Sequence, residues 1–113
     1  MEEELGMQKL STYLGFTIRA GKIAFGIDRI ETLKKACLLI ADGSLSENSL
    51  KIMRKTQERI GCPLLITESG LLGELTHRPA VKAAAIQDKQ LALAIEKEAS
   101  GKPQFKFYSG GQN

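Results

Sequence analysis

Short apolar runs alternate with helical segments along this 113-residue chain, and this alternation constrains the fold more than any other feature. Residues 36–41 read Ala-Cys-Leu-Leu-Ile-Ala and residues 64–67 read Leu-Leu-Ile-Thr, without the polar alternation of a half-exposed strand. Such runs are typical of strands that are buried on both faces. We therefore expect a central sheet with helices on both sides.

Two longer segments carry the periodicity of helices. Apolar residues follow helical spacing over residues 7–18, and Gly21 stands where a left-handed C-cap is expected. Residues 44–60 form the clearest amphipathic segment, with Ser44 and Ser46 as equally suitable N-caps. Both segments should pack one face against the sheet.

The remaining elements are shorter. Strands are predicted at residues 22–25 and 83–86, although alanine is a poor strand former in the second. Short helices are predicted at residues 27–33 and 71–75, and Asp88 is expected to cap a last helix. The order of these elements predicts an α/β protein, specifically a three-layer α/β/α sandwich with a mixed central sheet of about four strands.

With 113 residues the chain is long enough for one domain and too short for two. Its composition, 42% hydrophobic and 26% charged residues, is that of a chain that can bury a core. We expect this domain to span residues 1–99. From Ser100 the periodicity gives way to Gly101, Pro103 and paired glycines, so residues 100–113 are interpreted as a C-terminal tail.

The net charge of +3 is unevenly distributed. Residues 1–8 contribute −3, residues 9–59 contribute +5 from ten bases and five acids, and residues 60–113 contribute +1. A basic segment such as 9–59 can form the basic face that is typical of phosphate-binding domains. Ordinary solvent-exposed helix surfaces with mixed charges can give the same net charge.

Several classes of function are disfavoured. No stretch approaches the roughly 18 apolar residues of a membrane span, and glutamates stand where a signal peptide carries positive charge, so we expect a cytoplasmic protein with no membrane partner. Cys37 and Cys62 have no CxxC spacing and are interpreted as buried free thiols rather than metal ligands. The Gly21-Lys22 pair lacks the upstream glycine of a phosphate-binding loop, and His77 has no recognised catalytic partner. We expect a non-catalytic protein without cofactor or metal.

Three segments, in this order, resemble the bacterial branch of the ribosomal-protein family that binds kink-turn RNA. They are Arg-Ala-Gly-Lys-Ile at 19–23, Gly-Ile-Asp at 26–28, and Leu-Leu-Ile-Ala-Asp-Gly-Ser-Leu-Ser-Glu-Asn-Ser at 38–49. The likeness continues through Gly-Cys-Pro at 61–63, Leu-Gly-Glu-Leu at 72–75 and Asp-Lys at 88–89, covering about residues 5–99. Between Gly26 and Leu38 the chain is shorter than the family pattern, which predicts an abbreviated second helix.

The resemblance implies an RNA-binding α/β/α sandwich that contacts sharply bent RNA with one end of the fold. The positions that correspond to the strand-one lysine, the glycine after it and the polar start of helix two are Lys22, Gly26, Asp28, Arg29 and Thr32. The loop implied to pack on an extruded base comprises Thr76, His77, Arg78, Pro79 and Ala80.

The chemistry of these residues suits the implied role. Gly26 permits close approach of a backbone, and Lys22 and Arg29 suit salt-sensitive contacts to phosphates. Asp28 can only accept hydrogen bonds, which suits a guanine edge and not a phosphate. Each also has an ordinary structural role open to it: Gly26 as a turn glycine, Lys22 as a surface lysine, and Asp28 as a favourable acid in the first turn of a helix.

The function predicted from the sequence is non-catalytic RNA binding, with a ribosomal or kink-turn-containing structured RNA as partner and the ribosome as a possible site of action. The alternative is a protein-interaction module on the same fold that no longer binds kink-turns. In that reading the aromatic side chains of Phe105, Phe107 and Tyr108 dock on a partner or on a second copy.

Overall fold

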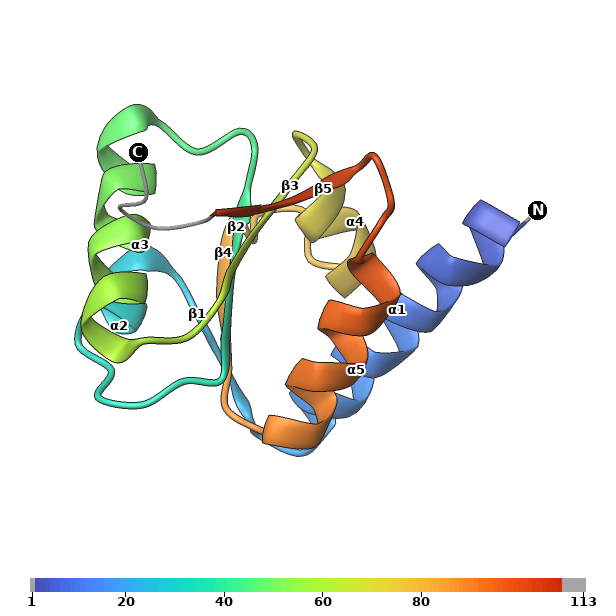
Figure 1. Cartoon of the computed structure of the whole chain (residues 1–113), viewed down its shortest axis with the longest axis horizontal. Coiled ribbons are helices and arrows are strands. Elements are labelled where there is room, and N and C mark those ends of the chain that lie inside the picture. The colour runs from blue at the N-terminus through green and yellow to red at the C-terminus, as the bar shows by residue number, and fades with distance from the viewer. Residues whose placement is uncertain (1, 109–113) are drawn as a thin grey trace.

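The computed structural model describes the backbone of residues 2–108 and the side chains of residues 6–108 (Figure 1). Helices and strands alternate strictly along this part of the chain. The helices are α1 (Glu2–Arg19), α2 (Ile27–Glu31), α3 (Glu47–Ile60), α4 (Leu71–Thr76) and α5 (Lys89–Ala99). The strands are β1 (Ile23–Phe25), β2 (Leu38–Asp42), β3 (Leu64–Thr67), β4 (Ala83–Ile86) and β5 (Phe105–Tyr108).

The strands form one mixed sheet in the order β1-β4-β2-β3-β5. β2 and β3 run parallel, with Leu39 opposite Leu64, and every other neighbouring pair is antiparallel. Figure 1 shows α2 and α3 on one face of the sheet and α1, α4 and α5 on the other. The three-layer α/β/α sandwich is therefore confirmed, with five strands where the sequence predicts about four.

The apolar run in β2 is explained by a separate core on each face of the sheet. Leu38 and Ile40 lie in the core beneath α1, α4 and α5, and Leu39 and Ala41 lie in the core beneath α2 and α3. All four side chains are almost fully buried. Since successive strand residues point to opposite faces, a strand covered on both sides must be apolar throughout.

The structure decides between the two candidate caps of α3. The Ser46 Oγ accepts a hydrogen bond from the Ser49 N–H at 3.1 Å, so Ser46 is the N-cap. Ser44 instead donates its hydroxyl to the Asp42 carboxylate. At the other end Gly61 ends the helix in the left-handed conformation, with φ of 81°, which a glycine adopts without steric cost.

The interpretation of residues 100–113 as a tail is wrong for the part that forms β5. This strand pairs with β3 along the edge of the sheet, with Phe105 buried and Tyr108 beneath the Arg54 guanidinium at 5.3 Å from the ring centroid. Flanking glycine and proline obscured a segment of strong strand propensity. Of the three aromatic residues proposed to dock on a partner, Phe107 is the one left substantially exposed. Residues 109–113 lie outside the described part of the chain.

A single buried carboxylate, that of Asp42, joins the ends of β2 and β3 to the start of α4. Its oxygens accept hydrogen bonds from the backbone N–H groups of Ser44 (3.0 Å), Gly70 (2.8 Å) and Leu72 (3.0 Å). The hydroxyls of Ser44 and Thr67 donate to it as well. The side chain is almost fully buried. The carboxylate thereby satisfies donors from Ser44, from the end of β3 and from the start of α4.

Two opposing effects act on the pKa of Asp42. Desolvation by burial acts to raise it, but the hydrogen bonds from Ser44, Gly70 and Leu72 together outweigh that effect and lower the pKa below the ordinary value of 3.8. A carboxylate whose pKa is depressed by folding stabilises the folded state above its unfolded pKa, and this contribution is lost as the pH falls through the folded value.

We predict that Asp42→Asn lowers the free energy of unfolding at pH 7 by about 2–3 kcal/mol, because the amide offers one acceptor oxygen and presents an NH₂ group to backbone donors. Urea denaturation at pH 7 measures this difference. The difference should shrink as the pH falls through the folded-state pKa of Asp42, where the wild-type carboxyl is itself protonated.

Asp88→Asn is the matched control. Asp88 caps α5 by accepting from the Leu91 N–H at 2.8 Å, and asparagine is an equally good N-cap. Its cost should stay within a few tenths of a kcal/mol. Equal losses in the two variants would contradict the anchoring role of Asp42.

Candidate nucleic-acid interface

One end of the sheet brings together two of the segments that the sequence singles out. Because β1 and β4 are antiparallel, with Phe25 opposite Ala84, the turn that follows β1 lies beside the loop that precedes β4. The Gly26 N–H donates to the Ala83 carbonyl at 3.2 Å, which extends this pairing by one residue. The turn at residues 26–29 and the loop at residues 77–80 therefore form one continuous edge of the molecule, which we call the turn–loop edge.

Gly26 occupies a backbone conformation that favours glycine, with φ of 91° and ψ of 141°. A Cβ built on it would meet no heavy atom within 4 Å outside its neighbours. The glycine is therefore required by backbone conformation rather than by crowding from the protein. The space above it is open, so a ligand backbone can approach it closely.

The predicted abbreviation of the second helix is confirmed, since α2 has five residues. Ile30 anchors α2 in the core, whereas Asp28 and Arg29 are exposed. Thr32 caps the far end of α2 and donates its hydroxyl to the Arg29 carbonyl at 2.8 Å. Asp28 and Arg29 thus stand next to Gly26, and Thr32 is set back from the edge by the length of the helix.

Arg78 joins the loop to β1. Its guanidinium carbon lies 5.3 Å from the centroid of the Phe25 ring, a cation–π contact that leaves the exposed side chain able to donate hydrogen bonds outward. The Val81 N–H donates to the Arg78 carbonyl at 2.9 Å and closes a turn around Pro79 and Ala80. Both of these turn residues are exposed.

His77 faces away from β1 and towards α1. Its Nε2 lies 3.3 Å from the Ser11 hydroxyl, and its backbone has a positive φ of 56°, an uncommon conformation for a residue with a side chain. Thr76, which the resemblance included in this loop, is buried in α4 and donates its hydroxyl to the Leu72 carbonyl at 2.9 Å. Thr76 therefore offers no surface contact.

Lys22 does not join the other predicted residues. Its carbonyl accepts a hydrogen bond from the Gln87 N–H at 2.7 Å, at the opposite end of the β1–β4 pair from Gly26. Four strand residues span about 13 Å, so one short contact cannot reach both positions. The structure therefore places Lys22 and Gly26 at opposite ends of β1, because an extended strand separates neighbouring residues along its axis.

Gly73 explains why the loop lies so close to α4. A Cβ at this position would lie 3.0 Å from the Pro79 carbonyl oxygen and 3.1 Å from the Arg78 carbonyl oxygen. The Arg78 N–H also donates to the Gly73 carbonyl at 2.9 Å. Neither the close contact at Gly73 nor the anchoring role of Asp42 was predicted from the sequence. An Asp-Gly-Ser segment directly after a buried strand is the signal that would have pointed to Asp42.

Other potentially reactive groups lie elsewhere. Cys37 and Cys62 are free thiols, with Cys62 buried and Cys37 half-buried. Burial raises the pKa of the Cys62 thiol, and the nearby Cys37 and Glu96 add to the increase, which disfavours the nucleophilic thiolate. Within residues 2–108 no three His, Cys, Asp or Glu side chains gather as metal ligands would. Nor is any helix in that range both long and apolar enough to cross a membrane.

Comparison with known proteins supports the fold alone. No protein-family model matches the sequence, and no functionally curated protein matches it significantly. A protein of unknown function from Bacillus halodurans C has a similar structure, with a TM-score of 0.72 over 80% of this chain and 95% of that chain. The two share 14% sequence identity. The fold therefore places this chain in the structural class of α/β/α sandwiches with a five-stranded mixed sheet.

We predict that Gly73→Ala destabilises the protein by about 1–3 kcal/mol, because the new methyl group must displace the backbone of residues 78 and 79. Thermal denaturation measures the loss. Gly15→Ala in α1 is the control, since a Cβ there meets only the end of the Arg19 side chain at 3.7 Å. That variant should be neutral or more stable by up to about 1 kcal/mol. Equal destabilisation by both substitutions would refute the role assigned to Gly73.

Proposed function

We propose that this protein is a non-catalytic RNA-binding protein that recognises a sharply bent, structured RNA of the kink-turn type through the turn–loop edge. The observation that carries the proposal is the juxtaposition of the turn at residues 26–29 with the loop at residues 77–80. These are the two segments to which the family resemblance independently assigns RNA contacts. They are about 50 residues apart in the sequence.

The edge has groups suited to the RNA backbone. Arg29 and Arg78 are exposed and lie on the two sides of the edge. Among the ion pairs of the described side chains, neither guanidinium has a carboxylate partner. Each can therefore donate to phosphate oxygens without first breaking a salt bridge. The open space over Gly26 lets the ribose-phosphate backbone approach between them.

The edge also has groups suited to bases. Asp28 is exposed and, as an acceptor, suits the imino and amino donors of guanine. Pro79 and Ala80 form an exposed apolar tip on which an unstacked base can rest. Structured RNA is generally read through splayed bases and backbone shape, so this combination fits RNA better than an undistorted duplex.

We predict that the double variant Arg29→Ala/Arg78→Ala binds a kink-turn RNA about tenfold or more weakly than the wild type and reduces the slope of log affinity against log salt by about 2, because two phosphate contacts are lost. Asp28→Ala should instead change the preference between the kink-turn RNA and a plain duplex of equal length. Fluorescence anisotropy titrations at two salt concentrations measure both effects.

Lys51→Ala/Lys55→Ala is the matched control, because it removes the same formal charge from exposed positions on α3. Its affinity should stay within about twofold of the wild type. The proposal fails if the wild type binds kink-turn and duplex RNA equally. It also fails if the arginine variant and the lysine control lose the same affinity, since binding would then be non-specific attraction.

A further inference from the structure

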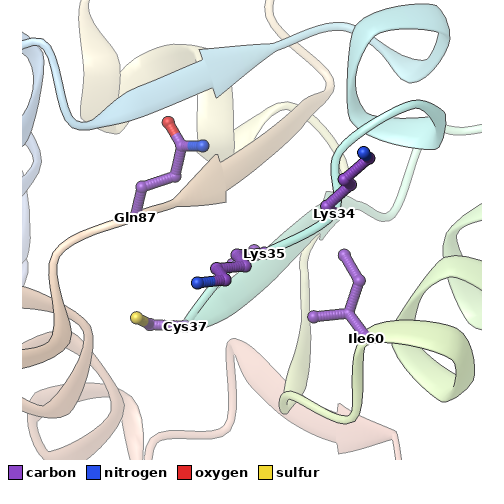
Figure 2. Close-up of a pocket in the computed structure, with 6 residues that line it drawn as sticks. Lys34, Lys35, Cys37, Ile60 and Gln87 are labelled. Atoms are coloured by element: carbon purple, nitrogen blue, oxygen red, sulfur yellow. The ribbon is translucent and has the colours of Figure 1, made fainter.

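A positively charged hollow lies at the opposite end of the sheet from the turn–loop edge (Figure 2). It has a volume of about 500 Å³, within the usual range for small-ligand sites. We call it the lysine groove, and its lining residues are Lys34, Lys35, Ala36, Cys37, Ile60 and Gln87. Figure 2 shows Lys34 and Lys35 on the segment leading into β2, with Gln87 at the end of β4 and Ile60 at the end of α3.

The groove is positively charged and its lysines are free to bind an anion. None of its lining residues is acidic. No ion pair of the described side chains involves Lys34 or Lys35. Asp88, which follows Gln87 directly, is already occupied as the N-cap of α5. Lys22, whose carbonyl is bonded to Gln87, adds another base at this end of the sheet.

The segment that carries the two lysines is held in place from α3. The Arg59 guanidinium donates to the Leu33 carbonyl at 2.7 Å and to the Glu31 carbonyl at 2.8 Å. At the far end of the segment, the Cys37 N–H donates to the Ile86 carbonyl at 2.8 Å. Because both ends are fixed, a ligand that binds the lysines does not have to order their backbone.

The lining divides into a charged part and a part suited to a planar ring. Ala36, Cys37 and Ile60 provide an apolar surface, and the Gln87 amide provides both a donor and an acceptor. A second hollow of about 370 Å³ adjoins the first through Ala36 and Cys37, and it is lined by both a basic residue, Lys89, and an acidic one, Glu96. A nucleotide matches this lining, because it has a phosphate for a lysine, a flat ring for the apolar surface and hydrogen-bonding edges for the Gln87 amide.

From these observations we propose that the lysine groove binds a nucleotide unit, with Lys35 on its phosphate and Gln87 on its base. In Figure 2 the Lys35 side chain extends to the side where Cys37 and Gln87 lie, and Lys34 extends the other way and adds positive charge to the groove. The source is either a single-stranded segment of RNA or a free nucleoside diphosphate, which share this chemistry. The proposal for the lysine groove rests on observations that do not involve the turn–loop edge. The five residues of β2 separate the two ends of the sheet by about 17 Å, so the protein holds two separate ligand segments.

The test titrates the full ¹⁵N-labelled chain separately with a single-stranded RNA octanucleotide, ADP and inorganic phosphate. Saturable shifts are expected at the Cys37 backbone amide and the Gln87 side-chain amide. Lys34→Ala/Lys35→Ala should weaken binding of the responding ligand about tenfold, and the Lys51→Ala/Lys55→Ala control should stay within about twofold of the wild type.

Each result has a defined meaning. Shifts with the octanucleotide alone assign the groove to an RNA strand, and shifts with ADP assign it to a free nucleotide. Either supports the proposal. It is overturned if neither ligand shifts these two groups, if inorganic phosphate produces the same shifts with the same affinity, or if both lysine double variants lose affinity equally. The kink-turn titration of the arginine variant concerns the turn–loop edge, so the two proposals fail separately.

Discussion

The buried carboxylate of Asp42 is the interaction on which the arrangement of the turn–loop end of this protein depends. β2 and β3 are parallel, so their carboxyl ends emerge at the same edge, where neither strand provides partners for the chain beyond it. Asp42 supplies acceptors to the backbone of Gly70 and Leu72 and so fixes where α4 begins. The loop that follows α4 is positioned in turn, since Gly73 allows it to lie directly against the helix.

The mixed topology gives the two ends of the sheet different characters. At one end a glycine turn and a proline-containing loop meet across the β1–β4 pair, with an arginine on either side. At the other end the chain passes through a segment of lysines held by Arg59. The net charge of +3 conceals this arrangement, because the acidic start of the chain offsets bases that gather at particular places in space.

Local signals in the sequence predicted most of the fold. The apolar runs placed β2 and β3, the helical spacing of apolar residues over 7–18 placed α1, and Asp88 was recognised as the cap of α5. The misses required information that is not local. β5 depends on pairing with β3, which is about 40 residues away in the sequence. The role of Asp42 was hidden because most of its partners, Thr67, Gly70 and Leu72, lie 25 to 30 residues further along the chain.

The edge strand β5 also covers an edge of the sheet that would otherwise be open. It pairs along the outer edge of β3, a strand made of Leu64, Leu65, Ile66 and Thr67. A chain ending near residue 100 would leave β3 as a bare sheet edge with a high propensity to add strands from other molecules. β5 itself presents Lys106 outward, the kind of charge that discourages such addition. A segment that looks dispensable in the sequence therefore shields the outer edge of β3 from strand addition.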